Sequence, residues 1–206
     1  GTAGKRGILI KGGVHLEHLG RIRAVAFDKT GTLTYGRPVV TDVVPFTGSE
    51  EELLALAASV EYGSEHPLAK AVVDRARAAG IVSVKVRDFE ALMGAGATAV
   101  VGDQSWYVGS PDLFHQLGVD LTTIEDRMRT LQADGKTVVL VGTQQALRGL
   151  LALQDRIREG MCEVIADLHA MGVRVVMLTG DNARTARSVA ETLGIAAPRL
   201  SFHLSA

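Results

Sequence analysis

The heptapeptide Asp28-Lys29-Thr30-Gly31-Thr32-Leu33-Thr34 directly follows the apolar run Ala24-Val25-Ala26-Phe27. The apolar run is typical of a buried strand, so the Asp28 carboxylate is expected where a strand ends and the chain turns. Small hydroxyl residues and a glycine surround it, which suits a site that holds a phosphoryl group against a nucleophile. A carboxylate can attack phosphorus and form an aspartyl-phosphate, which divides one difficult transfer into two easier steps. The alternative is an ordinary strand ending in a polar turn, which requires no such order of residues.

A second strand with a similar ending is expected at residues 173–178, before the turn Thr179-Gly180-Asp181-Asn182. Apolar residues recur at helical spacing on both sides of this strand, and Gly172 and Gly194 are stop signals for the two helices. The succession of helix, strand, loop and helix predicts a parallel α/β sheet. Ligands bind beyond the carboxyl ends of such strands, so Asp28 and Thr179 are expected to converge on one crevice.

The segment between these strands has a different character and is long enough, at about a hundred residues, for a small domain of its own. A capping box at Ser49 predicts a helix through Val60, and further helices are expected at residues 64–79 and 123–133. Short strands are expected at 82–86, 97–101, 106–108, 137–141 and 149–153. We therefore predict an α/β domain made of residues 1–41 and 149–206, split by an inserted α+β domain with an antiparallel sheet at residues 42–148.

Composition excludes several classes of function. The formal net charge of −1 and the aromatic content of 4% give no support for nucleic-acid binding, so no nucleic-acid partner is expected. The single cysteine, Cys162, rules out an internal disulfide framework. No apolar run approaches the length of a membrane span, and no secretory signal is visible.

The string Asp28 to Thr34 resembles the phosphorylation motif of the P-type cation-pumping ATPases. The resemblance implies that Asp28 is the nucleophile, that Mg²⁺ is held by the Asp28 carboxylate and the Thr30 carbonyl, and that the fold is the haloacid-dehalogenase-like parallel sheet. Thr179 and Thr32 are then expected to offer donors to the phosphoryl oxygens, with Asp181 near the metal and phosphate. An alternative role for Asp181 is a helix N-cap, which is compatible with the first. The full catalytic set is Asp28, Lys29, Thr30, Thr179 and Asp181.

Residue 30 separates two classes of enzyme on this sheet. Haloacid-dehalogenase-type phosphatases usually carry a second aspartate two residues after the nucleophile, which acts as general acid and base. Thr30 occupies that position and cannot take the role. The expected result is a slowly hydrolysed aspartyl-phosphate, which suits a pump better than a phosphatase.

The string Ser64-Glu65-His66-Pro67-Leu68-Ala69 resembles the His-Pro motif of the heavy-metal branch of these pumps, the P1B group. The resemblance implies an ATP site in which His66 and Glu61 lie near the adenine. Gly94, Gly96 and Gly109 correspond to the glycines of the same branch, where the backbone can approach a ligand closely. The alternative for His66 is a solvated helix cap. Asp155 and Arg158 resemble the Asp-x-x-Arg element that joins the two domains, although a helix-start aspartate followed by a surface arginine is the competing interpretation.

The resemblance extends from the segment Gly7 to Gly13, with Glu17 after it, through nearly the whole chain, but departs from the family pattern at residues 198–206. The family's Gly-Asp-Gly-x-Asn-Asp motif and its membrane helices are absent. We therefore expect a cytosolic part of a heavy-metal pump, truncated at its C-terminal end, that binds ATP but is phosphorylated poorly or not at all. The implied partners are an actuator domain and a heavy-metal ion bound by membrane helices. A soluble phosphohydrolase and a non-catalytic nucleotide-binding module are the competing functions. Copper(I), zinc, cadmium and cobalt all remain open as the transported metal.

Overall fold

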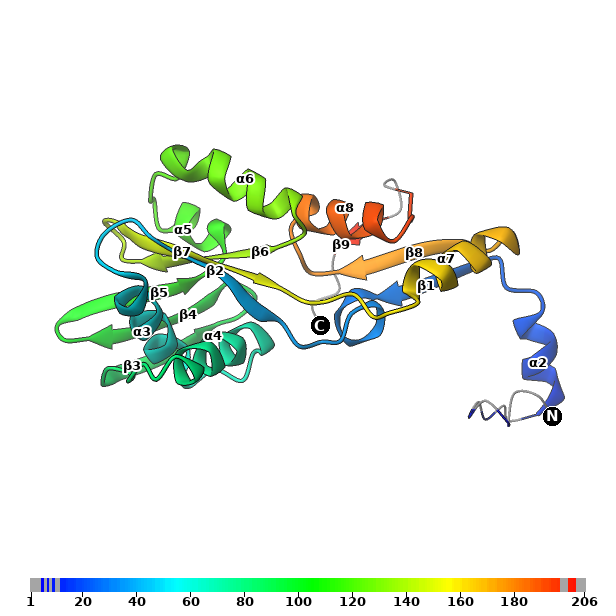
Figure 1. The fold of residues 1–206 in the computed structure, drawn as a ribbon, viewed down its shortest axis with the longest axis horizontal. Helices are drawn as coiled ribbons and strands as arrows, with labels where there is room; N and C mark the ends of the chain where they lie inside the picture. Colours follow the sequence, from blue (N-terminus) through cyan, green and yellow to red (C-terminus); the bar gives the residue numbers. More distant parts are fainter. Residues whose placement is uncertain (1–4, 6, 8, 10–11, 197–199, 203–206) are drawn as a thin grey trace.

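The computed structural model describes residues 5, 7, 9, 12–196 and 200–202 of the 206-residue chain. Part of the predicted resemblance at 7–13 therefore lies outside the described residues, as does most of the segment 198–206, where the sequence departs from the family pattern. The chain forms two domains that lie side by side (Figure 1). We call them the parallel-sheet domain and the antiparallel-sheet domain, after the sheet that each contains.

The parallel-sheet domain contains a three-stranded sheet with the order β1-β8-β9, in which both pairings are parallel. Its strands are β1 (Ala24–Asp28), β8 (Arg174–Thr179) and β9 (Leu200–Phe202), and its helices are α2 (Gly13–Leu19), α7 (Met161–Ala170) and α8 (Ala183–Thr192). Val175 and Met177 of β8 pack in one buried cluster with residues of α7 and α8. Helix α2 has no buried residue and projects away from the sheet (Figure 1).

The antiparallel-sheet domain contains a six-stranded sheet with the order β2-β7-β6-β5-β4-β3, in which every pairing is antiparallel. The strands are β2 (Val39–Pro45), β3 (Val86–Leu92), β4 (Gly96–Val101), β5 (Gln104–Gly109), β6 (Thr137–Gly142) and β7 (Leu147–Gln154). The helices are α3 (Glu50–Glu61), α4 (Pro67–Ala78), α5 (Pro111–Gln116), the short 3₁₀ turn η2 (Thr122–Ile124) and α6 (Glu125–Ala133).

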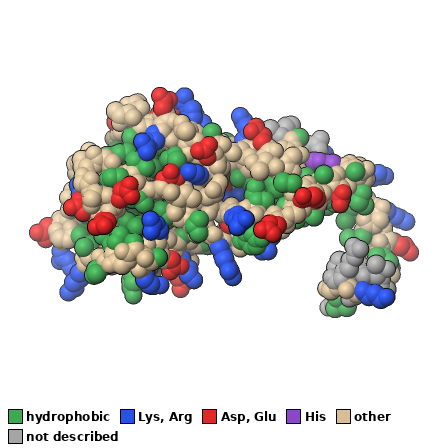
Figure 2. Space-filling model, viewed as in Figure 1, with side chains coloured by type: hydrophobic (Ala, Val, Ile, Leu, Met, Phe, Trp, Pro, Cys, Tyr) green, Lys and Arg blue, Asp and Glu red, His purple; other side chains and the backbone are tan. Residues whose placement is uncertain are grey.

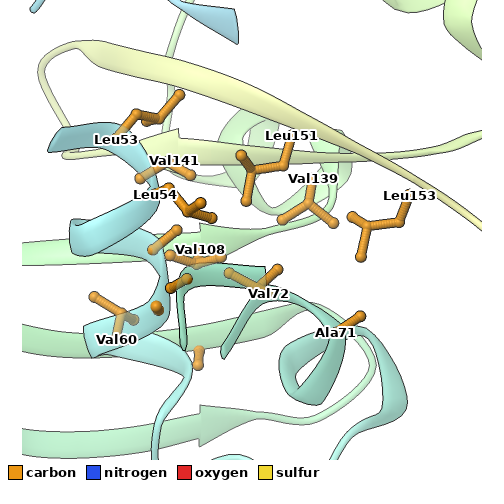
Figure 3. Packing of buried hydrophobic residues seen from close by; sticks show 14 of the residues in the cluster. Leu53, Leu54, Val60, Ala71, Val72, Val108, Val139, Val141, Leu151 and Leu153 are labelled. Atoms are coloured by element: carbon orange, nitrogen blue, oxygen red, sulfur yellow. The ribbon is translucent and has the colours of Figure 1, made fainter. Parts of the chain in front are cut away.

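Helices cover both faces of the six-stranded sheet. Helices α3 and α4 enclose one core, with Leu53 and Val72 against Val108 and Leu151 of the sheet (Figure 3). The half-buried Trp106 of β5 packs against the same cluster. Helices α5 and α6 enclose a second core on the other face, where the fully buried Phe114 packs with Leu140 and Leu150. Figure 2 shows basic and acidic side chains interspersed over the visible face of both domains.

The predicted fold class is confirmed, but the two predicted domain boundaries fall inside strands. Residues 41 and 148 lie within β2 and β7, and both strands belong entirely to the six-stranded sheet. We therefore propose that the division is better placed before β2 and after β7. The strand predicted at residues 82–86 is wrong, because the chain pairs only from Val86 onward.

Candidate active site

The carboxyl edge of the parallel sheet brings two of the predicted site residues together. Strands β1 and β8 are paired in register from Ala24 opposite Arg174 to Asp28 opposite Leu178. Asp28 is the last residue of β1 and Thr179 is the last residue of β8, so their loops leave the sheet side by side. The Asp28 side chain is exposed, whereas Thr179 is buried. The carboxylate is therefore accessible to a ligand at this edge.

An ion pair links the two loops. Lys29 Nζ donates to Asp181 Oδ2, and the lysine side chain is only 9% exposed and the aspartate 16%. The Asp181 backbone N–H donates to Thr179 Oγ1 at 3.1 Å, which orders the turn after β8. A largely buried ammonium requires a partner charge. Asp181 supplies that charge. The cation of the pair belongs to Lys29, the residue that follows Asp28 in the sequence.

The loop after β1 is an irregular turn, η1 (Lys29–Leu33), in which Gly31 adopts a left-handed conformation (φ +79°). The Thr34 hydroxyl closes the loop. Its Oγ1 lies within hydrogen-bond distance of two acceptors, the Lys29 carbonyl oxygen at 2.9 Å and Asp155 Oδ2 at 2.5 Å. Thr30 and Thr32 are exposed at this loop. Both residues are therefore accessible to a ligand at this edge of the sheet.

Asp155 and Arg158 both contact the loop that carries the motif. Asp155 Oδ1 accepts from the Arg37 backbone N–H at 3.1 Å. Arg158 donates from Nε to the Thr34 carbonyl and from Nη2 to the Gly31 carbonyl, each at 3.0 Å, and its guanidinium lies 5.0 Å from the centre of the Tyr35 ring. Arg158 is exposed, as the competing interpretation expected, but it also holds the motif loop. Asp155 does not start a helix, because α7 begins only at Met161. The sequence spacing gave a signal for this pair, but it did not indicate Tyr35 as a contact.

Asn182, not Asp181, is the N-cap of α8. Asn182 Oδ1 accepts from the backbone N–H groups of Arg184 and Thr185, at 3.0 and 3.1 Å. Asp181 is left to pair with Lys29. The prediction that Asp181 caps the helix is therefore wrong. Asn182, the next residue, is the cap, because its amide oxygen is a good helix-capping acceptor.

Glu61, the last residue of α3, is buried in the antiparallel-sheet domain. Burial raises the pKa of the Glu61 carboxyl to about 7, and a hydrogen bond with the Ser64 side chain opposes the rise only in part. A carboxyl group with this pKa exchanges its proton near neutral pH. It can therefore serve either as an acceptor or as a donor to a base edge.

His66 caps α4 and is exposed. Its Nδ1 accepts the Leu68 backbone N–H at 3.2 Å, and Pro67 occupies the first helical position. The structure thus contains the helix cap that the sequence offered as the alternative to a nucleotide role. The two roles are compatible, because capping uses the Nδ1 lone pair and leaves the faces of the imidazole ring.

The three predicted glycines have different surroundings. Gly96 and Gly109 pair across β4 and β5, where a Cβ on Gly96 would lie 2.1 Å from the Val108 carbonyl oxygen and a Cβ on Gly109 would lie 2.3 Å from the Ala95 carbonyl oxygen. Close approach of two strands therefore explains both glycines. Gly94 differs, since it has a left-handed φ of +68° and open space where a Cβ would lie.

Phe89 is a residue of this region that sequence reasoning missed. A Cβ on Gly63 would lie 2.9 Å from Phe89 Cδ1, so the ring packs directly on the loop between Glu61 and His66. The ring comes from an irregular part of β3, where the pairing with β4 shifts between Arg87 and Glu90 and Asp88 has a φ of +51°. The irregularity had no sequence signal, because Asp88 is not a glycine.

The expected magnesium site contains oxygen donors only, the Asp28 carboxylate and the Thr30 carbonyl. Within the described part of the chain, no three His, Cys, Asp or Glu side chains gather into a metal-binding group. Mg²⁺ is commonly bound through one or two carboxylates together with substrate phosphate and water. This donor set therefore fits a Mg²⁺ ion that binds together with a nucleotide.

Comparison with known proteins identifies the class. A protein-family model described as haloacid dehalogenase-like hydrolase matches residues 22–204. The chain therefore belongs to the haloacid dehalogenase-like hydrolase family. Within it, the predicted resemblance to the cytosolic phosphorylation and nucleotide-binding domains of P1B-type ATPases is confirmed by the relatives that follow.

A probable cadmium-transporting ATPase of Staphylococcus aureus is 43% identical over 202 residues, which cover 95% of this chain and 25% of the relative. A copper-exporting P-type ATPase of Bacillus subtilis (strain 168) is 42% identical over 197 residues, with coverage of 95% and 25%. The chain thus spans about a quarter of the length of these curated relatives.

Two solved structures support the same assignment. A zinc-transporting PIB-type ATPase in the E2.Pi state matches with a TM-score of 0.70 and 42% identity, covering 98% of this chain and 32% of that one. The catalytic domain of the CPx-ATPase CopB-B matches with a TM-score of 0.68 and 27% identity, covering 96% and 67%. In this chain, none of the helices among the described residues combines the length and apolar character of a membrane span.

Proposed function

We propose that this chain is the ATP-binding and phosphorylation region of a heavy-metal cation-exporting P-type ATPase. The observation that carries the proposal is the adjacency of Asp28 and Thr179 at one sheet edge, with the Lys29–Asp181 ion pair joining their loops. Similarity to cadmium- and copper-transporting ATPases supports the assignment to a pump. The proposal names no single metal, because the relatives differ in the metal that their names give.

Asp28 is proposed to accept the γ-phosphoryl group. A carboxylate oxygen forms a bond to the γ-phosphorus while the bond from that phosphorus to the bridging oxygen breaks, and ADP leaves with the electron pair. Thr179 and Thr32 provide hydroxyl or backbone donors to the phosphoryl oxygens, and Lys29 contributes positive charge. The Asp28 carboxylate and the Thr30 carbonyl would hold Mg²⁺, which would neutralise part of the phosphate charge.

Thr30 favours a pump over a simple phosphohydrolase. A threonine hydroxyl cannot act as the general acid and base that speeds hydrolysis of an aspartyl-phosphate. The intermediate is then expected to persist long enough to drive a change of shape elsewhere in the protein. The proposed partners are the actuator domain of the same pump and a heavy-metal ion bound by membrane helices, and the proposed location is the cytosolic side of a membrane.

The nucleotide site is proposed to lie in the antiparallel-sheet domain. His66 offers a ring face to adenine and Glu61 offers a carboxyl group to the amino edge of the base. Gly94 is the glycine that supports direct ligand approach, whereas Gly96 and Gly109 act by letting β4 and β5 come close. ATP would thus be held by one domain while its terminal phosphate reaches the other.

Calorimetric titration with ATP tests the nucleotide site. We expect wild-type protein to bind and His66→Ala to weaken binding roughly tenfold, equivalent to about 1.4 kcal/mol. His115→Ala is the matched control, because His115 is an exposed histidine in the last turn of α5. Equal affinities for wild type and His66→Ala would count against the site.

Labelling with [γ-³²P]ATP and Mg²⁺ tests the role of Asp28. We expect at most a weak signal, which is acid-stable, sensitive to hydroxylamine and lost in Asp28→Asn. Label that survives Asp28→Asn would contradict the assignment of the nucleophile. Rapid turnover of small phosphate esters would instead favour the phosphohydrolase.

A further inference from the structure

The two domains are joined by two adjacent chain crossings. One crossing runs from Thr34 to β2 and the other follows β7, and they touch at a bridge between Thr34 and Ile157. Asp155 holds both, since it accepts from Thr34 Oγ1 and from the Arg37 N–H. Two crossings at one place act as a single hinge. A fixed angle between the domains then requires a contact away from that hinge.

Such a contact exists between α8 of the parallel-sheet domain and the end of α6 in the antiparallel-sheet domain. Ser188 Oγ donates to the Ala133 carbonyl at 2.7 Å, and Thr185 Oγ1 donates to the Lys136 carbonyl at 2.8 Å. Ala133 is the last residue of α6, whose final carbonyls have no partner within the helix. Hydroxyl groups of one domain thus complete the helix end of the other.

The contact is packed as well as hydrogen-bonded. Thr185 is fully buried, and its Oγ1 also accepts from Asn182 Nδ2 at 3.0 Å, so the hydroxyl has both a donor and an acceptor. Gly135 has a left-handed φ of +75° and lies between the two bonded carbonyls, and a Cβ added to it would lie 3.4 Å from Ser188 Oγ and 3.6 Å from Val189 Cγ2. A buried polar group that loses its partner costs more than an exposed one. Thr185 is therefore the central residue of this contact.

The Thr185 hydroxyl is also hydrogen-bonded to the loop after β8, residues Thr179–Asn182. Asn182, which donates to Thr185, caps α8 and directly follows Asp181, the partner of Lys29. A continuous series of contacts thus runs from the motif loop through Asp181, Asn182 and Thr185 to the Lys136 carbonyl. We propose that Thr185, aided by Ser188, is a positioning residue that fixes the angle of the antiparallel-sheet domain relative to the Thr179–Asn182 loop.

The consequence for phosphoryl transfer rests on the proposed function, but the contact itself does not. If ATP is bound by one domain and attacked by the other, the angle that Thr185 holds sets where the terminal phosphate lies. Release of the contact would free the antiparallel-sheet domain to turn about the crossings at Thr34 and Ile157. Thr185 would then act without touching the nucleotide.

A distance measurement between spin labels tests the proposal without nucleotide. Cys162, the single cysteine, is exposed on α7 and takes one label. Asp103→Cys, at a fully exposed position in the turn between β4 and β5, takes the other. We expect a narrow distance distribution in the otherwise wild-type protein. Thr185→Val combined with Ser188→Ala removes both interdomain hydrogen bonds, one of them from a fully buried hydroxyl. The double variant is expected to broaden the distribution, because the ratio of molecules with α6 and α8 apart to molecules with them in contact should rise about tenfold.

Two further variants separate positioning from general destabilisation. Thr185→Ser keeps the hydroxyl and is expected to retain the narrow distribution. Thr130→Val removes a hydroxyl that bonds only within α6, to the Asp126 carbonyl, and is expected to have no effect. A distribution unchanged by Thr185→Val with Ser188→Ala would overturn the proposal, as would equal broadening in Thr130→Val. ATP affinity should be unchanged in these variants, so a failure of nucleotide binding in wild type would refute the proposed function and leave this test intact.

Discussion

Glu61 couples the protonation of a single carboxyl group to the stability of its domain. The folded chain favours the neutral form, because burial raises the pKa of Glu61 from its ordinary 4.5 to about 7. The native state therefore binds more protons than the unfolded chain between these two values. Stability is expected to fall as the pH rises through that window and to level off above it.

Glu61→Gln is expected to remove this pH dependence. The full cost of ionising Glu61 in the folded chain is about 3 kcal/mol at pH 8, from the size of the pKa shift. Urea unfolding of wild type and Glu61→Gln at pH 5 and pH 8 measures the difference. Glu65→Gln, a change at an exposed carboxylate in the same loop, serves as the control. A wild-type stability that rises from pH 5 to pH 8 relative to Glu61→Gln would contradict the sign.

The Lys29–Asp181 ion pair is expected to stabilise the parallel-sheet domain, because both side chains are largely buried. Asp181→Asn leaves a lysine that is 9% exposed without a counter-charge, and is expected to cost roughly 2–4 kcal/mol. Lys29→Met is expected to cost less, and the double variant less than the sum of the two. Hydrogen exchange of the β8 amides reports the change. Asp74→Asn removes the exposed Asp74–Arg77 pair and should change stability by less than about 0.5 kcal/mol.

At the scale of elements, the contact between the α3–α4 loop and β3 lies between the two proposed nucleotide-binding residues, Glu61 and His66. Gly63 has no left-handed φ, so its lack of a side chain is required by the Phe89 ring and not by the backbone. The irregular pairing of β3 near Asp88 is what brings the ring to the loop.

Gly63→Ala is expected to destabilise the protein by about 1–3 kcal/mol, because the new methyl group overlaps the Phe89 ring. Phe89→Leu makes room, so the double variant should be more stable than the sum of the single changes predicts. Thermal unfolding measures each free energy. Strict additivity of the two changes would show that the ring and the glycine do not share this contact.

Prediction of elements succeeded where a local signal was strong. The capping box at Ser49 is confirmed, with Glu52 N–H donating to Ser49 Oγ and Glu52 Oε2 accepting from the Ser49 N–H. Strand β2 was missed because it ends in Pro45, a residue that only an edge strand tolerates, and β2 is an edge strand. Helix α5 was missed although Ser110 and Pro111 are a readable helix start, because it is only six residues long.

The candidate site could be predicted from the sequence only in part. The placement of Asp28 and Thr179 followed from two strands with the same polar ending. Contacts that join distant segments, such as Thr185 with the Lys136 carbonyl and Phe89 with Gly63, depend on how the domains and the loop pack. No spacing along the chain encodes these contacts, because they form only when the domains and the loop pack together.

At the scale of the whole molecule, the two domains have separate cores. One buried cluster, which includes Met177, belongs to the parallel-sheet domain, and two others lie on the faces of the six-stranded sheet. The hinge and the contact at Thr185 join them through polar groups. Each domain is therefore expected to respond separately to a change in its own core.

Leu151→Ala and Met177→Ala are expected to lower different unfolding transitions. Both side chains are fully buried, and each truncation should cost about 2–5 kcal/mol. Differential scanning calorimetry should show Leu151→Ala lowering the transition of the antiparallel-sheet domain and Met177→Ala that of the parallel-sheet domain. A single transition shifted equally by both variants would contradict separate cores.

The half-buried Trp106 gives the chain a built-in optical reporter. It is the single tryptophan, and among the described residues it packs against the core formed by α3 and α4. Indole fluorescence should therefore report the unfolding of the antiparallel-sheet domain and not that of the parallel-sheet domain. Circular dichroism reports the helices and strands of both domains together. The difference between the melting temperatures from fluorescence and from circular dichroism therefore measures how strongly one domain stabilises the other.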